Sequence, residues 1–268
     1  MDFDFNLIAV PFGMRPGLRR LEPGTPQLTR LDAASRLHQE KHAVWVAGES
    51  RHVAPGFDPA PALDAIAGHA AAHGVDHEAR DGTRPPELAF EEDLAVLDGA
   101  TGTLPWLCVC VPSHWAPEDK VGLDFAALHG PVADNAALIA ASRQLVGLVT
   151  GGECWERHVW TISPSGRHDQ HPRRQARTAW PAPGDPAAFA AQCWLRAERQ
   201  TFFPVGRGTR QAVFTIRVML QPLAQAVAQP WQALRLHDSL ASMSASVLAY
   251  KNHAEARNPL LRWLESRT

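Results

Sequence analysis

Two neighbouring segments in the third quarter of the chain set arginines among apolar residues in the pattern of adjacent β-strands. The segments are 193–203 (CWLRAERQTFF) and 212–220 (AVFTIRVML). Side chains alternate between the two faces of a strand, so Arg199 shares a face with Leu195, Ala197 and Phe203. An unpaired buried charge costs several kcal/mol or more. Arg199 therefore needs a carboxylate, backbone carbonyls or a ligand, and the segment predicts a pocket as well as a core.

Length and charge limit the classes of protein that the chain can belong to. Its 268 residues allow one large domain or two small ones with a sizeable core. The 26 basic and 28 acidic residues give a net charge of −2, which argues against a dedicated nucleic-acid surface. The start, MDFDFNLIAV, is acidic where a secretory signal is basic, and no apolar run approaches membrane-spanning length. Its four cysteines are expected to be reduced thiols, so we expect a soluble, cytoplasmic protein.

The order of the predicted elements indicates an α+β fold, with an antiparallel sheet and helices on one face. A Pro- and Gly-rich arm or collar is expected first, and a polar, mobile loop later. We expect three regions: an N-terminal arm with helices, a central core, and C-terminal helices. The three regions are residues 1–85, 86–225 and 226–268; the arm covers 1–27 and the polar loop 164–186. Strands are expected at 93–97, 106–111, 156–163, 193–203 and 212–220. Helices are expected around 32–44, 61–73, 117–149, 238–252 and 259–266.

Several motifs resemble one known family in their order and spacing. They are PFGMRPGL near the start, EEDL at 91–94, LCVCVPSHWAPEDKVG followed by LHGPV, and LRAERQTF followed by AVFTIRVML. The chain resembles the haem-binding alpha subunit of the haem-dependent oxidative N-demethylases over about residues 9 to 252. The resemblance implies a PAS-like domain that holds haem b between a helix and the sheet. It also implies oxygen-dependent demethylation of a small secondary amine such as dimethylamine, with electrons from a partner that carries flavin and an iron–sulfur cluster.

His129 is the expected iron ligand. Asp124 is a suitable N-cap for a short helix, Phe125 and Leu128 provide its apolar face, and Gly130 with the proline after it ends it. His129 also matches the family position in the LHGPV motif. A single neutral imidazole is a common protein ligand of haem iron. The alternative is a histidine that caps the last carbonyls of the helix.

Arg199 and Glu198 are the expected catalytic residues. A fixed guanidinium in a dry pocket stabilises the negative charge that dioxygen acquires, and Arg199 is the candidate for this role. The alternative for Arg199 is a structural ion pair with a nearby acid. Glu198 precedes it on the opposite strand face and is the candidate for proton transfer. Arg196, Glu198 and Gln200 are expected to face solvent or the collar, unless a bulge exchanges the faces.

Four further residues are candidates for the cofactor site. Phe214 and Ile216 share one face of their strand, whereas Arg217 lies on the other, where it could enter the pocket or lock the collar to the sheet. We favour the structural role for Arg217. Trp160 could line a substrate cavity, although ordinary core packing is the safer interpretation. The chain departs from the family pattern in having a single tyrosine, Tyr250, so a tyrosine donor in the site is not expected.

These observations leave three functional hypotheses. The first is oxidative demethylation of a small amine by haem and dioxygen, with electrons from a partner subunit, because the chain has no flavin or nicotinamide motif of its own. The second is a haem-binding gas or redox sensor on the same scaffold, since a fold does not determine a function. The third is a structural subunit without haem.

Overall fold

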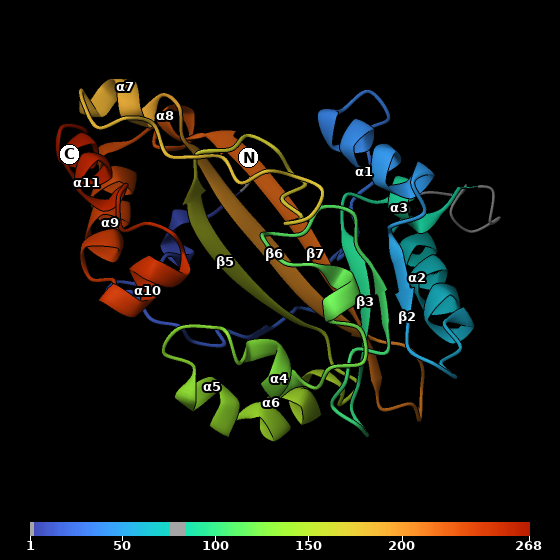
Figure 1. The fold of residues 1–268 in the computed structure, drawn as a ribbon. Coiled ribbons are helices and arrows are strands. Elements are labelled where there is room, and N and C mark those ends of the chain that lie inside the picture. The colour runs from blue at the N-terminus through green and yellow to red at the C-terminus, as the bar shows by residue number, and fades with distance from the viewer. Residues whose placement is uncertain (1–2, 76–83) are drawn as a thin grey trace.

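The structure is a computed structural model and describes residues 3–75 and 84–268. Its centre is an antiparallel sheet of seven strands in the order β1-β5-β6-β7-β3-β4-β2 (Figure 1). The strands are β1 (Arg19–Arg20), β2 (Arg51–Val53), β3 (Asp93–Asp98), β4 (Trp106–Cys108), β5 (Trp155–Ser163), β6 (Trp194–Pro204) and β7 (Gln211–Pro222). All five strands expected from the sequence are present, and β1 and β2 extend the sheet at its two edges.

The α+β class is thus confirmed, and helices precede, separate and follow the strands along the chain. Two single 3₁₀ turns, Phe5–Leu7 and Pro117–Asp119, accompany them. The helices are α1 (Arg36–Val46), α2 (Ala60–Ala72), α3 (Pro86–Ala89), α4 (Phe125–His129), α5 (Ala136–Ala140), α6 (Ser142–Val149), α7 (Pro186–Ala190), α8 (Leu223–Ala226), α9 (Pro230–Ala241), α10 (Ala245–Tyr250) and α11 (Arg257–Glu265). In the part of the chain described, no helix has the length and apolar character needed to cross a membrane.

The two faces of the sheet are distinguished by strand register. Phe202 of β6 pairs with Phe214 of β7, and their rings stack 4.6 Å apart on the side where Phe125 of α4 packs. The next pair, Phe203 and Val213, points the other way and packs with Ile66 of α2. We call these the α4 face and the α2 face.

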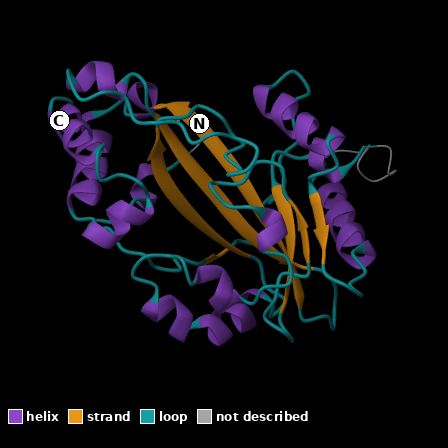
Figure 2. Ribbon diagram, viewed as in Figure 1, coloured by secondary structure: helices purple, strands orange, loops and turns teal. Residues whose placement is uncertain are grey.

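Helices pack on both faces, so the expectation of helices on one face was wrong. Figure 2 shows helices on either side of the strands. Leu195 and Ala197 on the α2 face pack with the C-terminal helices α9 and α11, whereas Ile216 and Val218 on the α4 face pack with Leu37 of α1. A strand that is buried on both faces needs helices or loops packed on each face. The arginine-containing strands β6 and β7 contribute apolar residues to both of these interfaces.

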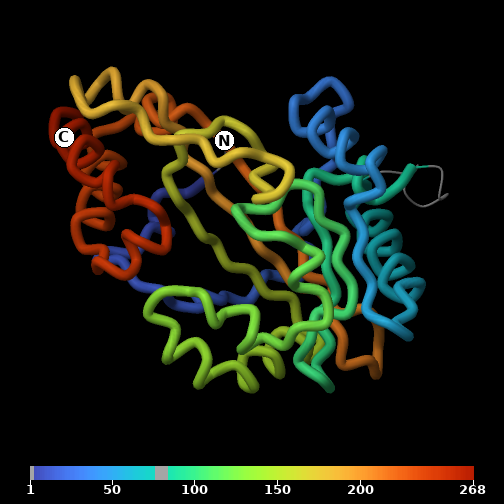
Figure 3. Tube along the Cα trace, viewed as in Figure 1, coloured from blue at the N-terminus to red at the C-terminus, as the bar shows by residue number. Residues whose placement is uncertain are grey.

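The N-terminal arm is ordered by the C-terminal helices, as expected for a collar. The backbone carbonyls of Asn6 and Ile8 accept hydrogen bonds from Arg235 of α9, and the Ala9 carbonyl accepts one from Ser239. Figure 3 shows the blue arm running beside the red C-terminal segment. The two ends of the chain therefore form one layer, and the division into regions 1–85, 86–225 and 226–268 stays a prediction.

The polar loop 164–186 is anchored at its centre, although the sequence suggested a mobile segment. Asp169, Gln170 and His171 are buried. The Asp169 amide donates a 2.8 Å hydrogen bond to Glu40 of α1. Arg196 of β6 donates to the carbonyls of residues 167 and 168 at 3.2 and 3.0 Å. The loop thus covers one end of the α4 face.

Candidate active site

His129 ends the short helix α4 with one ring nitrogen engaged. The Asp124 side chain caps the helix by accepting from the Ala127 amide at 2.8 Å, and Asn135 donates to the carbonyls of His129 and Gly130. His129 Nδ1 lies 2.8 Å from the Phe125 carbonyl, and the two rings stack 4.1 Å apart. A carbonyl can only accept, so Nδ1 carries the hydrogen and Nε2 keeps its lone pair.

The protonation state of His129 suits a metal ligand. Burial lowers the pKa of the imidazole; the Phe125 carbonyl opposes this shift, and the nearby charges of Arg157 and Lys120 add to it. The ring is therefore neutral at neutral pH. A histidine that binds metal through one nitrogen usually donates the other N–H to a carbonyl, which fixes the ring and its tautomer. His129 has this arrangement before any ligand binds.

Glu198 is held by two donors on the α4 face. The Ser113 hydroxyl donates a short hydrogen bond to Oε1, and Gln200 Nε2 donates to Oε2 at 2.7 Å. Ser113 is itself oriented by Arg196, whose Nε donates to the hydroxyl oxygen at 2.8 Å. The carboxylate is thus fixed in direction and still partly open to solvent.

Arg196 is buried on the same face, which corrects the expectation that it faces solvent or the collar. It is only 1% exposed. Its guanidinium donates to the carbonyls of Val111, Arg167 and His168 as well as to Ser113. Backbone carbonyls can satisfy a buried guanidinium, so the apolar pattern of the strand did not reveal which way this side chain points.

Arg157 of β5 is the feature of this face that the sequence analysis did not select. Register places Arg157 opposite Gln200, and Val159 opposite Glu198, so all four side chains are on the α4 face. Arg157 Nε is buried and has no hydrogen-bond partner among residues 3–75 and 84–268. Burial lowers the pKa of this guanidinium, while Glu198 and Tyr250 raise it. The charge of Arg157 also lowers the pKa of His129, which indicates that Arg157 lies near α4.

Two residues of α10 and its C-terminal end complete this surface. Tyr250 is 46% exposed; partial burial raises the pKa of its hydroxyl, and the charge of Glu198 adds to the shift. Burial also lowers the pKa of Lys251 to about 8; the charge of Glu198 opposes this shift and that of Arg157 adds to it. Lys251 Nζ donates to the Trp160 carbonyl at 2.9 Å. Lys251 reaches β5 across 91 positions of sequence, where no local pattern signals it.

The structure places Arg199 on the α2 face, away from His129. Its Nε donates to Glu156 at 2.9 Å and another nitrogen donates to the Pro26 carbonyl of the arm at 3.0 Å. Glu156 also pairs with Arg19. Arg199 and Glu198 diverge as the alternation predicted, and the structure does not bring Arg199 and His129 together.

The other cofactor candidates divide between the faces. Phe214 and Ile216 lie on the α4 face with His129. Arg217 lies on the α2 face, where it donates to Glu91 at 2.6 Å; this is a structural ion pair, but Glu91 lies outside the arm 1–27, so the pair does not lock the collar to the sheet. Trp160 is buried in the core on the α2 side, with its ring perpendicular to that of Phe12.

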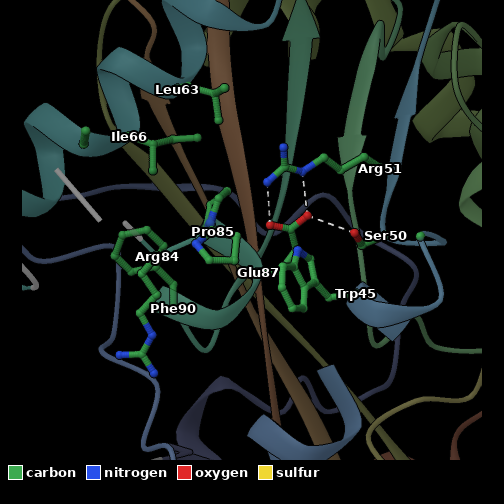
Figure 4. Close-up of a pocket in the computed structure, with 12 residues that line it drawn as sticks. Trp45, Ser50, Arg51, Leu63, Ile66, Arg84, Pro85, Glu87 and Phe90 are labelled. Carbon is green, nitrogen blue, oxygen red and sulfur yellow. Dashed lines mark hydrogen bonds and ion pairs between the residues drawn. The ribbon is translucent and has the colours of Figure 1, made fainter. Parts of the chain in front are cut away.

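Two cavities lie near these layers. A cavity of about 30 Å³ opens beside Lys251, Thr161 and His114, next to Ser113, and is large enough for a water molecule. A cavity of about 650 Å³ lies between α1, α2 and α3 (Figure 4). In the larger one, Glu87 is paired with Arg51 at 2.6 and 2.8 Å and with Ser50, and this pairing lowers its pKa. These groups satisfy one another, so the surface around His129 is the better candidate for chemistry.

The residues on the α4 face suit haem by their chemistry. Nε2 of His129 is a neutral nitrogen on a fixed ring, and Phe214 and Val159 are partly exposed apolar residues, whereas Ile216 is buried against Leu37. Arg157, which is partly exposed and has an unpartnered Nε among the described residues, provides a cation for an anionic group. Among the described side chains, no cluster of three or more His, Cys, Asp or Glu forms a metal site. A haem site with one protein ligand is a different arrangement and needs no such cluster.

Comparison with known proteins identifies the family of the chain. The family described as haem-dependent oxidative N-demethylase, alpha subunit-like, matches residues 87–261, which is well over half of the chain. No curated protein matches the sequence. The chain therefore belongs to the haem-dependent oxidative N-demethylase alpha subunit-like family, as the motifs suggested. The match includes α4, the three long strands and α10, so every residue of the candidate site lies within it.

Proposed function

We propose that this protein is a haem-dependent oxidoreductase that removes a methyl group from a small secondary amine. Membership of the family supports the class of reaction. The observation that carries the proposal is the free Nε2 of His129 on a ring fixed by the Phe125 carbonyl, in the same layer as Glu198 and Arg157. We further propose that the haem is haem b, that the core is PAS-like, and that the protein is cytoplasmic.

The overall reaction needs partners that this chain does not contain. One amine, one dioxygen, two electrons and two protons give the demethylated amine, formaldehyde and water. Bound haem would supply the redox-active iron at which dioxygen is reduced. The electrons would come from a partner protein carrying flavin and an iron–sulfur cluster.

Each residue of the site has a distinct task in this proposal. His129 holds the haem through Nε2. Phe214 and Ile216 exclude water from one side of the site. Glu198, fixed by Ser113 and Gln200, accepts a proton from the amine at a carboxylate oxygen and holds the amine in place. Arg157 takes the role of the cation in the site that the sequence had suggested for Arg199.

Haem loading of wild type, H129A and H73A tests this proposal. His73 is a matched control, because its Nδ1 also lies 2.8 Å from the carbonyl four residues before it, at the end of α2. We expect stoichiometric haem with a strong Soret band in wild type and H73A, and a weakened or shifted band in H129A. With a reductant and oxygen, the wild type should then release formaldehyde from at least one member of a panel of small N-methylamines, in which dimethylamine is included.

The possible results separate the three hypotheses. Absence of haem from the wild type would refute the oxidative mechanism and favour a structural subunit. Haem binding without formaldehyde from any small N-methylamine would favour a gas or redox sensor. An unchanged spectrum in H129A would remove His129 as the ligand and would leave the family assignment intact.

A further inference from the structure

Arg157 differs from the arginines on the opposite face of the same sheet. Arg199 and Arg217 each donate to a carboxylate, at 2.9 and 2.6 Å. Arg157 has a buried Nε without a hydrogen-bond partner among the described residues. The side chain as a whole is only partly buried, so a ligand can reach its guanidinium; an unsatisfied buried N–H on a cation in a candidate site indicates a binding partner that is anionic.

Glu198 does not fill this role, although it is the nearest acid in the layer. Its Oε1 accepts from Ser113 and its Oε2 from Gln200. Glu198 acts on the pKa of Arg157 through its charge, and among the described residues the two form no hydrogen bond through the Arg157 Nε. The carboxylate is thus directed by its own donors and stays available for a cationic group.

The charges of this layer leave a surplus of positive charge. Arg157 and Lys251 are both cations near Glu198. Arg196 is a third, although backbone carbonyls and Ser113 satisfy it. A simple dialkylammonium ion would add another positive charge to this surface. A zwitterion would place an ammonium group at Glu198 and a carboxylate at Arg157, so it matches the site better.

We propose that Arg157 binds a carboxylate on the substrate, and that the substrates are N-methylated amino acids. This inference rests on the proposed demethylation and defines its substrate class. The carboxylate is unchanged in the reaction: the N-methyl compound, dioxygen, two electrons and two protons give the free amino acid, formaldehyde and water. A haem propionate is chemically the same partner for Arg157, and the experiment must separate the two sources.

Binding to the haem-loaded protein, without reductant, tests the inference by titration calorimetry. The probes are N-methylglycine and N-methylglycinamide, which have nearly the same shape and differ in the carboxylate. A charge-assisted hydrogen-bonded pair is worth about tenfold to a hundredfold in affinity. We expect wild type to prefer N-methylglycine by about that factor, R157Q to lose the preference, and R157K to keep part of it. R19Q is the control, because Arg19 pairs with Glu156 on the other face.

Each outcome has a defined meaning. Equal binding of the two probes by wild type, or an unchanged preference in R157Q, would overturn the inference. Loss of haem from R157Q with the preference intact in the remaining holoprotein would assign Arg157 to a propionate, which also overturns it. If R157Q does not fold, R157K decides in the same way. Selective carboxylate binding without formaldehyde release would refute the proposed function and support the substrate-binding role of Arg157.

Discussion

Replacing Lys41 by methionine should strongly destabilise the fold. Lys41 of α1 is completely buried. Its Nζ donates to the carbonyls of Phe90, Glu91 and Glu92 at 2.9, 3.2 and 2.8 Å, and lies 3.2 Å from Asp93 Oδ1 at the start of β3. Burial disfavours the charge, but Asp93 and other acids prevail and raise the pKa of Lys41. One ammonium group thus joins α1 to the central sheet.

The loss in the free energy of unfolding can be estimated from the buried groups that lose their contact with the Lys41 ammonium. Methionine keeps the apolar stem, so little packing is lost. Asp93 keeps its hydrogen bonds from the amides of Cys110 and Val111, at 3.0 and 2.8 Å, but loses its cation, and three carbonyls lose a donor. Removing one partner of a buried pair costs about 3–5 kcal/mol. For a chain of this size that corresponds to a fall in Tm of roughly 10 °C.

Urea unfolding of K41M, D93N, the double variant and K120M measures this effect. Lys120 is only partly buried, so K120M should change stability by no more than about 0.5 kcal/mol. The double variant should be more stable than the sum of the single effects predicts, because neither charge is then left alone. A loss below about 1 kcal/mol in K41M would refute the reasoning.

Two further predictions concern the site and acid stability. S113A should lower demethylation by roughly tenfold to a hundredfold with unchanged haem content, because Glu198 loses a charge-assisted hydrogen bond that orients it; S113T should restore part of the rate. His253 is buried against the Ile162 carbonyl, and burial lowers its pKa to about 4 from 6.5. The unfolded chain therefore binds more protons between pH 6.5 and 4, so stability should fall by up to about 3 kcal/mol as pH decreases through that range, and H253Q should flatten the dependence measured by urea unfolding.

Controls separate these effects from general damage. Ser50 donates to the buried Glu87 at 2.8 Å, so S50A removes the same kind of hydrogen bond far from His129. It should lower stability and leave the rate of demethylation unchanged. Equal losses of rate in S50A and S113A would contradict the positioning role of Ser113. An unchanged slope of stability against pH in H253Q would contradict the assignment of acid sensitivity to His253.

The sequence contains enough information for the strands and for the helix that carries His129. Alternation in β6 correctly predicts that Glu198 and Arg199 diverge, and Asp124 and Gly130 correctly bound α4. The pattern distinguishes two faces of a strand, but it does not say which helix covers each face. Arg199 and His129 were therefore expected in one pocket, whereas the helix of His129 packs on the face opposite Arg199.

A signal for the face of the candidate site was present in two neighbouring strands. Arg157 of β5 and Arg196 and Glu198 of β6 form a polar stripe across paired strands, which a pocket explains better than solvent does because Arg196 is buried. Lys251 had no comparable signal. It reaches Trp160 through the packing of α10 against β5, and such long-range contacts are set by tertiary structure.

The position of Lys251 and His253 along β5 affects how other proteins can attach. Beyond its two residues paired with β1, the outer edge of β5 would expose carbonyls to an incoming strand. Lys251 and His253 occupy the carbonyls of Trp160 and Ile162, each at 2.9 Å, and the opposite edge ends in the three-residue strand β2. The β5 border is thus capped at these two carbonyls and the β2 border is short, which disfavours β-augmentation and edge-to-edge aggregation. We expect the proposed electron donor to dock on helices and loops rather than by adding a strand.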